Sequence, residues 1–350
     1  MCRTINGIDV NFEDLYRRNI NAVIETGNPI CTNLRSAVQK DGRGNICPCT
    51  IILPTLAMEA EKDVDKFFRL LNKKLDEAKD SLIERFEWIC SQSWESARFM
   101  YQNNVMAGYI PEEGIKSALK HGTVVIGMIG IAETLQILIG CNQTSPEGLK
   151  LAKKICQLYK QKCAEYKEKY KLNFGVYFTP AENLCYTAMK KFQQTYGVIE
   201  KVSDHDFFTN SVHVPVWEKL DLFEKIDIES QLACYNSAGS ITYIELDASA
   251  RNNPKALEKI VNYAMDKDIP YFALNTPIDL CENCGYEAEI PEDCCPKCGG
   301  NKIQRLRRVT GYLTGDFKAS FNAGKVAEVE SRVKHTGVNI EDNDEEEGDM

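Results

Sequence analysis

Apolar residues recur at spacings of three and four, the pattern typical of amphipathic helices, in several long segments of the chain. The clearest segment covers residues 56–91 and is long enough for two helices. The same spacing predicts helices over residues 148–172, 181–196, 256–267 and 326–334. Short extended segments lie between them, at residues 50–53, 173–179, 241–246 and 270–274. Because strands alternate with helices, the pattern favours an α/β protein with a parallel sheet, either open or closed into a barrel.

Length and cysteine content limit the class of protein. The chain has 350 residues, enough for one large core or two ordinary ones, and no linker rich in Pro, Gly or Ser divides it. It has 15 cysteines, but the sequence contains neither a cleavable signal nor an apolar run long enough to span a bilayer. The longest apolar segment, residues 123–138, is interrupted by Gly127, Gly130 and Glu133. We therefore expect a cytoplasmic protein without membrane contact, whose cysteines are reduced thiols or metal ligands.

The charge balance argues against a nucleic-acid-binding protein. Acidic residues number 51 and basic residues 42, so the net charge is −9, the wrong sign for a general nucleic-acid binder. Part of the acidity lies in a C-terminal tail, residues 339–350, which we expect to be disordered and solvated.

Two Cys-x-x-Cys pairs near the C-terminus predict a metal site. Cys281 and Cys284 form the first pair and Cys295 and Cys298 the second, which together offer four thiolates for a tetrahedral ion. Cys294, next to Cys295, is the alternative ligand if the second pair is shifted by one residue. Four thiolates leave no open position for water, so we expect structural zinc in a zinc-ribbon-like element.

The segment after this element carries a resemblance to a known family. RVTGYLTGDFKASFNAGKVAEVESRVKH, residues 308–335, resembles the glycyl radical segment of anaerobic, class III ribonucleoside-triphosphate reductases. GRGNICPCTIILPTLAMEA, GMIGIAETLQILIG, TPAENLC and FFTNSVHVPV are also similar to that family, so the resemblance covers essentially the whole chain. It implies about the C-terminal half of a ten-stranded glycyl-radical-type α/β barrel. It also implies a partial barrel at residues 1–276, the four-cysteine element at 277–302, and the radical loop and last helix at 303–338.

The resemblance also implies roles for individual residues. Gly311, in RVTGYL, matches the glycine whose α-hydrogen is removed by a separate iron–sulfur activase that uses S-adenosylmethionine. Glycine suits a radical because its α-carbon can flatten and delocalise the spin over both flanking amides. Cys2, in MCRT, matches the cysteine that becomes the thiyl radical, although an incidental thiol near the terminus is an equal alternative. Asn45, in GRGN, falls where formate-using members have an asparagine near the substrate.

Other segments have a functional and a structural interpretation. Gly127 and Gly130 could line substrate phosphates, because glycines that open a helix expose N–H groups, or they could serve close packing. Thr179 and Glu182, in TPAE, start a helix and border the nucleotide site according to the resemblance. A second group of residues is most simply explained by packing or solvation, with a redox, substrate or phosphate role as the alternative: Cys47, Cys49, His213, Arg305, Arg307 and Arg308.

The resemblance covers only half of a full-length reductase, which leads to an expectation about partners. We expect the chain alone to be inactive and to need an N-terminal reductase half, from a split gene or a longer reading frame. The other expected partners are the activase, ribonucleoside triphosphates and a second copy in a homodimer. The competing hypothesis is a zinc-ribbon interaction protein, or an inactive reductase fragment, without chemistry of its own. Similarity to pyruvate formate-lyase is weaker, since the adjacent pair Cys294 and Cys295 lies in the metal element.

Overall fold

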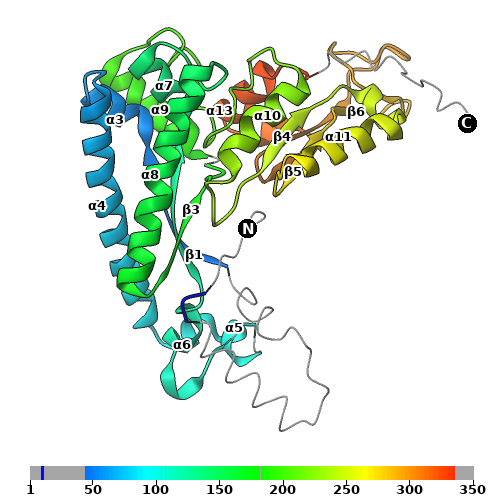
Figure 1. Cartoon of the computed structure of the whole chain (residues 1–350). Helices are drawn as coiled ribbons and strands as arrows, with labels where there is room; N and C mark the ends of the chain where they lie inside the picture. Colours follow the sequence, from blue (N-terminus) through cyan, green and yellow to red (C-terminus); the bar gives the residue numbers. More distant parts are fainter. Residues whose placement is uncertain (1–8, 12–43, 104, 107, 182, 336–350) are drawn as a thin grey trace, which may run out of the picture. The chain divides into compact units, whose positions relative to one another are not determined.

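A computed structural model describes residues 9–11, 44–103, 105–106, 108–181 and 183–335 (Figure 1). These residues form two compact units. The first comprises the described residues up to His213 together with Gln231–Ser240, and the second comprises Val214–Ser230 and the described residues from Ile241 onward. Helix α10 (Leu222–Ala233) passes from the second unit into the first.

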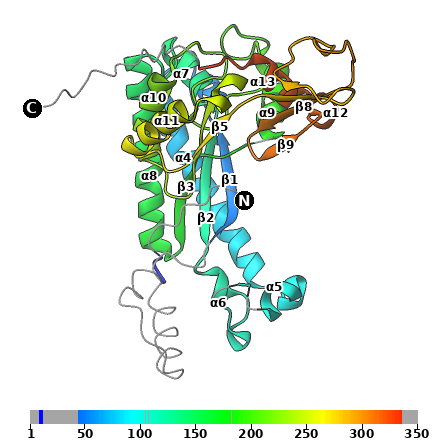
Figure 2. The ribbon, with the colours of Figure 1, turned by 90° about the vertical axis from the view of Figure 1, so that its right-hand side faces the viewer.

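A three-stranded parallel sheet forms the centre of the first unit. Its strands are β1 (Asn45–Ile52), β2 (Thr123–Ile129) and β3 (Asn173–Tyr177), in the order β1-β2-β3 (Figure 2). Every residue of β2 and β3 is buried, as expected for a parallel sheet with both faces covered. Tyr177 continues the parallel pairing to Gly239, on the far side of β3 from β2.

Helices connect these strands and pack on the sheet. The long helices α4 (Val64–Cys90) and α8 (Pro146–Tyr170) pack on β1 and β3 and contact each other. In Figure 1 they run side by side along the sheet. The remaining helical elements of this unit are α3 (Leu53–Glu59), η1 (Trp94–Ala97), α5 (Arg98–Gln102), η2 (Pro111–Glu113), α6 (Lys116–Leu119), α7 (Ile131–Ile139) and α9 (Asn183–Tyr196).

The second unit contains two small sheets. Strands β4 (Thr242–Glu245) and β5 (Phe272–Asn275) are parallel and are joined through η3 (Ala248–Asn252) and α11 (Pro254–Asp266). An antiparallel sheet follows in the order β7-β6-β8-β9. Its strands are β6 (Ile278–Cys281), β7 (Glu287–Ala288), β8 (Ile303–Val309) and β9 (Tyr312–Thr314). The short helix α12 (Phe317–Ser320) and α13 (Ala323–Ser331) complete the unit.

The predicted helices and the α/β class are confirmed. Residues 56–91 contain two helices, α3 and α4, separated where Glu61 and Lys62 take positive φ angles of 56° and 67°. Asp63 then begins α4, because its side chain accepts a hydrogen bond from the N–H of Lys66. Strand β2 and helix α10 were not predicted. The apolar segment 123–138 contains both β2 and α7, and a fully buried strand lacks the alternation that would separate it from a buried helix.

None of the described helices combines the length and the apolar character needed to cross a membrane.

Candidate functional site

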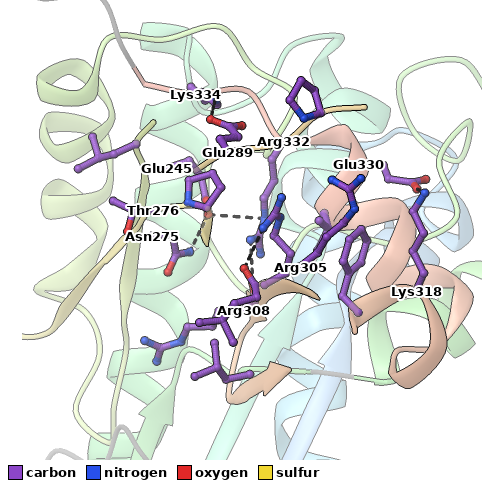
Figure 3. A pocket seen from close by; sticks show the side chains of 18 of the residues that line it. Glu245, Asn275, Thr276, Glu289, Arg305, Arg308, Lys318, Glu330, Arg332 and Lys334 are labelled. Carbon is purple, nitrogen blue, oxygen red and sulfur yellow. Dashed lines mark hydrogen bonds and ion pairs between the residues drawn. The ribbon is translucent and has the colours of Figure 1, made fainter. Parts of the chain in front are cut away.

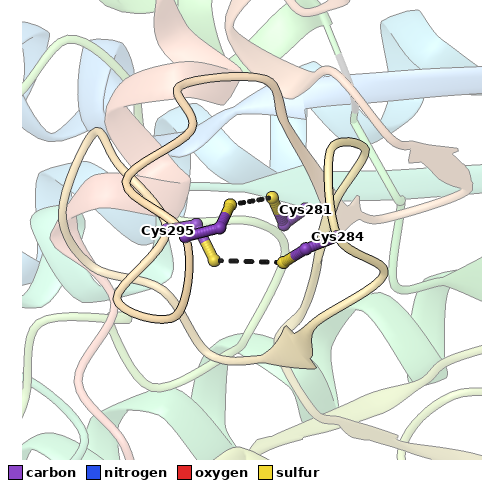
Figure 4. A group of neighbouring side chains, drawn as sticks. Cys281, Cys284 and Cys295 are labelled. Carbon is purple, nitrogen blue, oxygen red and sulfur yellow. Dashed lines mark hydrogen bonds between the residues drawn. The ribbon is translucent and has the colours of Figure 1, made fainter.

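The four predicted metal ligands lie together in the second unit. The Sγ atoms of Cys281 and Cys298 are 3.6 Å apart, and those of Cys284 and Cys295 are 3.7 Å apart. All four Sγ atoms lie within 4.8 Å of one another (Figure 4). Cys295 belongs to this cluster, whereas the adjacent Cys294 is exposed and does not. The cluster could therefore hold one metal ion.

Two similar turns build the cluster. In each turn a glycine N–H donates to the carbonyl of the first cysteine: Gly285 to Cys281 at 2.9 Å and Gly299 to Cys295 at 2.8 Å. Both glycines have a φ of 70°, in the left-handed region that disfavours a Cβ. The N–H of Gly300 also points at the sulfur of Cys298, at 3.4 Å. The sequence therefore places glycine where the turn requires it.

Electrostatics in the cluster favour a bound cation. Burial opposes ionisation of Cys281, but the N–H groups of Cys284 and Asn283 outweigh it and lower the pKa of Cys281 to about 7. At Cys298 the N–H of Gly300 favours the thiolate, but the neighbouring thiols outweigh it and raise the pKa to about 12. One thiolate thus forms readily, whereas further negative charges need a cation to balance them.

The segment RVTGYL forms a hairpin a few residues after the cluster. Val309 pairs with Tyr312, so Thr310 and Gly311 are the two turn residues between β8 and β9. Thr310 takes the left-handed conformation, with a φ of 51°, and Gly311 does not have a positive φ. The side chain of Thr310 is buried, with 2% exposure, whereas Gly311 is exposed. In strand β9, which follows the turn, Leu313 is 63% exposed. Gly311 therefore lies at an accessible tip.

A cavity of about 600 Å³ lies beside this hairpin within the second unit (Figure 3). Residues from the ends of β4 and β5, from β8 and from α13 line it. The basic residues Arg305 and Arg307 are half-buried here and form ion pairs with Asp279, at 3.5 Å and 2.6 Å. The interpretation of Arg305, Arg307 and Arg308 as a solvated face is therefore wrong, because they donate hydrogen bonds to the carbonyl of Ile290, the carboxylate of Asp279 and the carbonyl of Thr310.

Asn45 is the first residue of β1 in the other unit. It is 7% exposed, and its Nδ2 donates to the carbonyl of Ala238 at 3.0 Å. Its Oδ1 is buried and has no hydrogen-bond partner in the described part of the chain. Cys47 and Cys49 follow on the same strand, and burial raises the pKa of both thiols although Arg85 opposes the shift. Both thiols are thus protonated; Cys47 is buried, as predicted, whereas Cys49 is only half-buried.

Three of the four predicted substrate-binding residues, Gly127, Gly130 and Thr179, lie near the carboxyl ends of β2 and β3. Gly127 is inside β2, and a Cβ there would meet Oγ1 of Thr179 at 1.7 Å. Thr179 Oγ1 also lies 3.0 Å from Oγ1 of Thr50. Gly130 precedes α7 with a φ of 74°, and a Cβ there would meet Cγ of Pro54 at 2.5 Å. Close packing by itself therefore accounts for glycine at both positions, and phosphate binding stays a prediction.

Helix α7 carries a buried acid that the sequence analysis did not assign. Oε1 of Glu133 accepts hydrogen bonds from the N–H and the Oγ1 of Thr209, both at 2.7 Å. Burial raises the pKa of Glu133 to about 7, even though these hydrogen bonds act in the opposite direction. The sequence signal for this buried acid was the position of Glu133 inside the longest apolar segment, residues 123–138. Cys2 and Glu182 lie outside the described residues.

Comparisons with known proteins identify the class. The family profile described as anaerobic ribonucleoside-triphosphate reductase matches residues 4–335. The chain therefore belongs to this family. The anaerobic ribonucleoside-triphosphate reductase of Escherichia coli (strain K12) is 33% identical over 311 residues, covering 85% of this chain and 43% of that protein. The protein of the same name from Enterobacteria phage T4 is 33% identical over 309 residues, covering 84% and 49%.

Solved structures show the same fold. A structure titled anaerobic ribonucleotide reductase matches with a TM-score of 0.68 at 22% identity, covering 85% of this chain and 46% of that one. The anaerobic ribonucleotide reductase from Thermotoga maritima, with dATP bound in the specificity site, matches with a TM-score of 0.60 at 23% identity, covering 77% and 43%. This chain thus spans less than half of the length of these relatives.

Proposed function

We propose that the chain is the C-terminal catalytic portion of an anaerobic ribonucleoside-triphosphate reductase, which reduces ribonucleoside triphosphates to 2′-deoxyribonucleoside triphosphates by glycyl and thiyl radical chemistry. The observation that carries the proposal is Gly311. It occupies a two-residue turn at an accessible tip and does not have a positive φ, so the backbone conformation gives no reason for glycine. A radical stabilised by both flanking amides gives one.

In this proposal the activase reaches Gly311 at the hairpin tip. Its iron–sulfur centre and S-adenosylmethionine generate a radical that takes the α-hydrogen of Gly311, which leaves the unpaired electron on the α-carbon. The glycyl radical then takes a hydrogen atom from the thiol of Cys2, and the resulting thiyl takes the 3′ hydrogen of the ribose. With formate as reductant, the 2′-hydroxyl takes up a proton and leaves as water, formate supplies two electrons and a hydrogen and is oxidised to carbon dioxide, and the thiol of Cys2 returns the hydrogen atom to C3′.

The substrate roles extend this proposal to the first unit. Asn45 has a buried carbonyl oxygen without a partner among the described residues, and this oxygen can accept a hydrogen bond from a hydroxyl of the substrate. Gly127, Gly130 and Thr179 lie near the carboxyl ends of parallel strands, where open α/β sheets bind ligands, and Glu182 follows in the sequence. We assign the triphosphate to this edge of the sheet.

We propose zinc as the ion held by the four cysteines. A tetrahedron of thiolates with zinc–sulfur distances of about 2.3 Å has sulfur–sulfur edges of about 3.8 Å. The observed separations of 3.6 Å and 3.7 Å match that size. Cys281, Cys284, Cys295 and Cys298 would fill all four positions, so the metal would hold β6 and β8 in place and take no part in the chemistry.

The partial coverage of the relatives leads to the proposed partners. We place the described parallel strands in a ten-stranded barrel, with residues 1–276 as the partial barrel, 277–302 as the zinc element and 303–338 as the radical loop and last helix. The other strands of the barrel would come from the segments that the relatives have outside the match. We propose that the assembled protein is a homodimer in the cytoplasm. Without them Gly311 stays exposed to water and oxygen, so we expect the chain alone to be inactive.

The test is anaerobic activation followed by electron paramagnetic resonance. The chain is mixed with the N-terminal half of a relative, the activase, a reductant and S-adenosylmethionine, and a glycyl doublet is expected. Gly311→Ala should abolish the doublet and leave metal content unchanged. If the wild-type chain gives no doublet while retaining about one metal per chain, the proposal fails, and the metal-binding interaction protein becomes the better explanation.

A further inference from the structure

The turn that carries Gly311 is strained, but at the residue before it. Thr310 has a φ of 51°, and a β-branched residue is a clear outlier in the left-handed region. Its side chain is buried, and its Oγ1 has no hydrogen-bond partner within the described residues. No hydrogen bond of the Thr310 side chain therefore stabilises this conformation of the turn. Strained residues of this kind persist only where the surrounding structure holds them.

Two arginines hold the backbone of this turn. Nε of Arg308 donates to the carbonyl of Thr310 at 3.0 Å. Nη1 of Arg332 donates to the carbonyl of Arg308 at 2.7 Å, and Figure 3 shows these two arginines side by side. The guanidinium of Arg308 also lies over the ring of Tyr243, 5.6 Å from its centroid. Both donors are charged, so these hydrogen bonds are stronger than those between neutral groups.

The arginines tie the turn to the parallel strands of the same unit. Arg332 lies between two acids, with Nε 3.6 Å from Oε1 of Glu245 and Nη2 3.2 Å from Oε1 of Glu328. Glu245 ends β4, and Asn275, which ends β5, donates to its Oε1 at 2.8 Å. A continuous series of contacts therefore runs from β4 and β5 to the turn. The β8–β9 ladder contributes only three residue pairs, so it needs this additional support.

We propose that Arg308 and Arg332 are positioning residues for Gly311. The inference rests on the proposed function, in which Gly311 carries the radical. The carbonyl of Thr310 belongs to the amide whose nitrogen is bonded to the α-carbon of Gly311. A glycyl radical needs both flanking amides to lie in one plane with that carbon. By fixing the Thr310 carbonyl, Arg308 holds this amide at one orientation, and Arg332 holds Arg308.

The hydrogen bond can be tested without any radical. The sequence has four Thr–Gly peptides, so threonine labelled at the carbonyl carbon together with ¹⁵N-glycine gives four nuclear magnetic resonance signals: Thr26–Gly27, Thr310–Gly311, Thr314–Gly315 and Thr336–Gly337. Gly311→Ala identifies the signal of the turn by removing it. Arg308→Met keeps an apolar stem without a donor, and it should move the Thr310 carbonyl signal upfield while Thr314 stays in place. An unchanged Thr310 signal overturns the proposal.

The positioning role is tested by the yield and shape of the glycyl doublet in the activated complex. Arg308→Met should lower the radical yield per chain by about ten-fold, the factor that a charged hydrogen bond of about 1.4 kcal/mol accounts for. The remaining doublet should be broader, and Arg308→Lys, which keeps a charged donor, should recover part of the yield. A merely structural role would change metal content and circular dichroism, which should both stay at the wild-type level.

Two further variants keep the result interpretable. Arg332→Lys retains a charge between Glu245 and Glu328, so it should fold, and it should shift the Thr310 signal in the same direction by less. Lys318→Met is the matched control, because Lys318 lines the same cavity but is exposed and forms its ion pair with Glu330. A shifted Thr310 signal with a wild-type doublet overturns the positioning role. Absence of a doublet in the wild-type chain overturns the proposed function, whatever the Thr310 signal shows.

Discussion

The four-cysteine cluster and the β8–β9 hairpin differ in the backbone conformation of their glycines. In the cluster, Gly285 and Gly299 both have a φ of 70°, so glycine serves the conformation of the turns. In the hairpin the left-handed residue is Thr310, and Gly311 beside it does not have a positive φ. The φ angle therefore explains glycine at residues 285 and 299 but not at residue 311, where the proposed glycyl radical supplies a reason. The predictions below test this contrast.

The largest effect is expected at the cluster. Cys295→Ser should remove most of the bound metal and unfold the β7-β6-β8-β9 sheet, since structural zinc contributes about 10 kcal/mol or more to folding. Metal analysis and thermal unfolding would measure both. Cys294→Ser is the matched control, because Cys294 is adjacent but exposed and lies outside the cluster. Metal loss in Cys294→Ser, with metal retained in Cys295→Ser, would mean that the second pair binds in the shifted alignment.

A fall in pH should lower the free energy of unfolding through His335, which binds the Glu245 end of β4. Nδ1 of His335 accepts the N–H of Glu245 at 2.9 Å, and burial, aided by Lys225, lowers the pKa of His335 to about 4. Because the unfolded chain binds this proton near pH 6.5 and the folded chain near pH 4, stability falls as the pH drops through that window, by about 3 kcal/mol.

His335→Asn separates the contribution of His335 to the pH dependence of stability from the contribution of the cluster cysteines, which also titrate. Asparagine can accept the same N–H and does not titrate, so the loss of stability between about pH 6.5 and 4 should be smaller in the variant. Denaturant unfolding at several pH values, with metal content measured at each, gives the difference. Parallel pH profiles for the wild type and the variant would contradict the prediction.

Part of this contrast could be predicted from sequence and part could not. The sulfurs of Cys281 and Cys284 can reach one ion because these residues are three apart, and the same holds for Cys295 and Cys298, so the local spacing was enough to predict the cluster. The support of the hairpin depends on Arg332 reaching Arg308 and Glu245, which are 24 and 87 residues away. The spacing of apolar residues along the chain does not predict such long-range contacts. Similarly, β2 was missed because burial on both faces removes its alternation, whereas the amphipathic helices α4 and α8 were found.

Alanine substitutions should separate the two kinds of glycine. Gly299→Ala places a Cβ at a φ of 70°, so we expect a loss of about 1–2 kcal/mol in the free energy of unfolding and weaker metal binding. Gly311→Ala meets no such penalty and should keep both stability and metal while losing the radical. Thermal unfolding, metal analysis and paramagnetic resonance on both variants make the comparison. A strongly destabilised Gly311→Ala would show that the turn needs glycine for its shape.

The smallest effect is expected at Thr310. Thr310→Gly removes a strain of about 1–3 kcal/mol, but it also increases the entropy of the unfolded chain and loses the buried methyl group. The free energy of unfolding should therefore rise by about 1 kcal/mol or less. Thr314→Gly is the control, because Thr314 lies in β9 without a positive φ and its Oγ1 accepts the N–H of Asp316 at 3.3 Å, so it should destabilise. If Thr310→Gly destabilises as much as Thr314→Gly, packing of the Thr310 side chain outweighs its strain. The turn would then be fixed by its own contacts as well as by the two arginines.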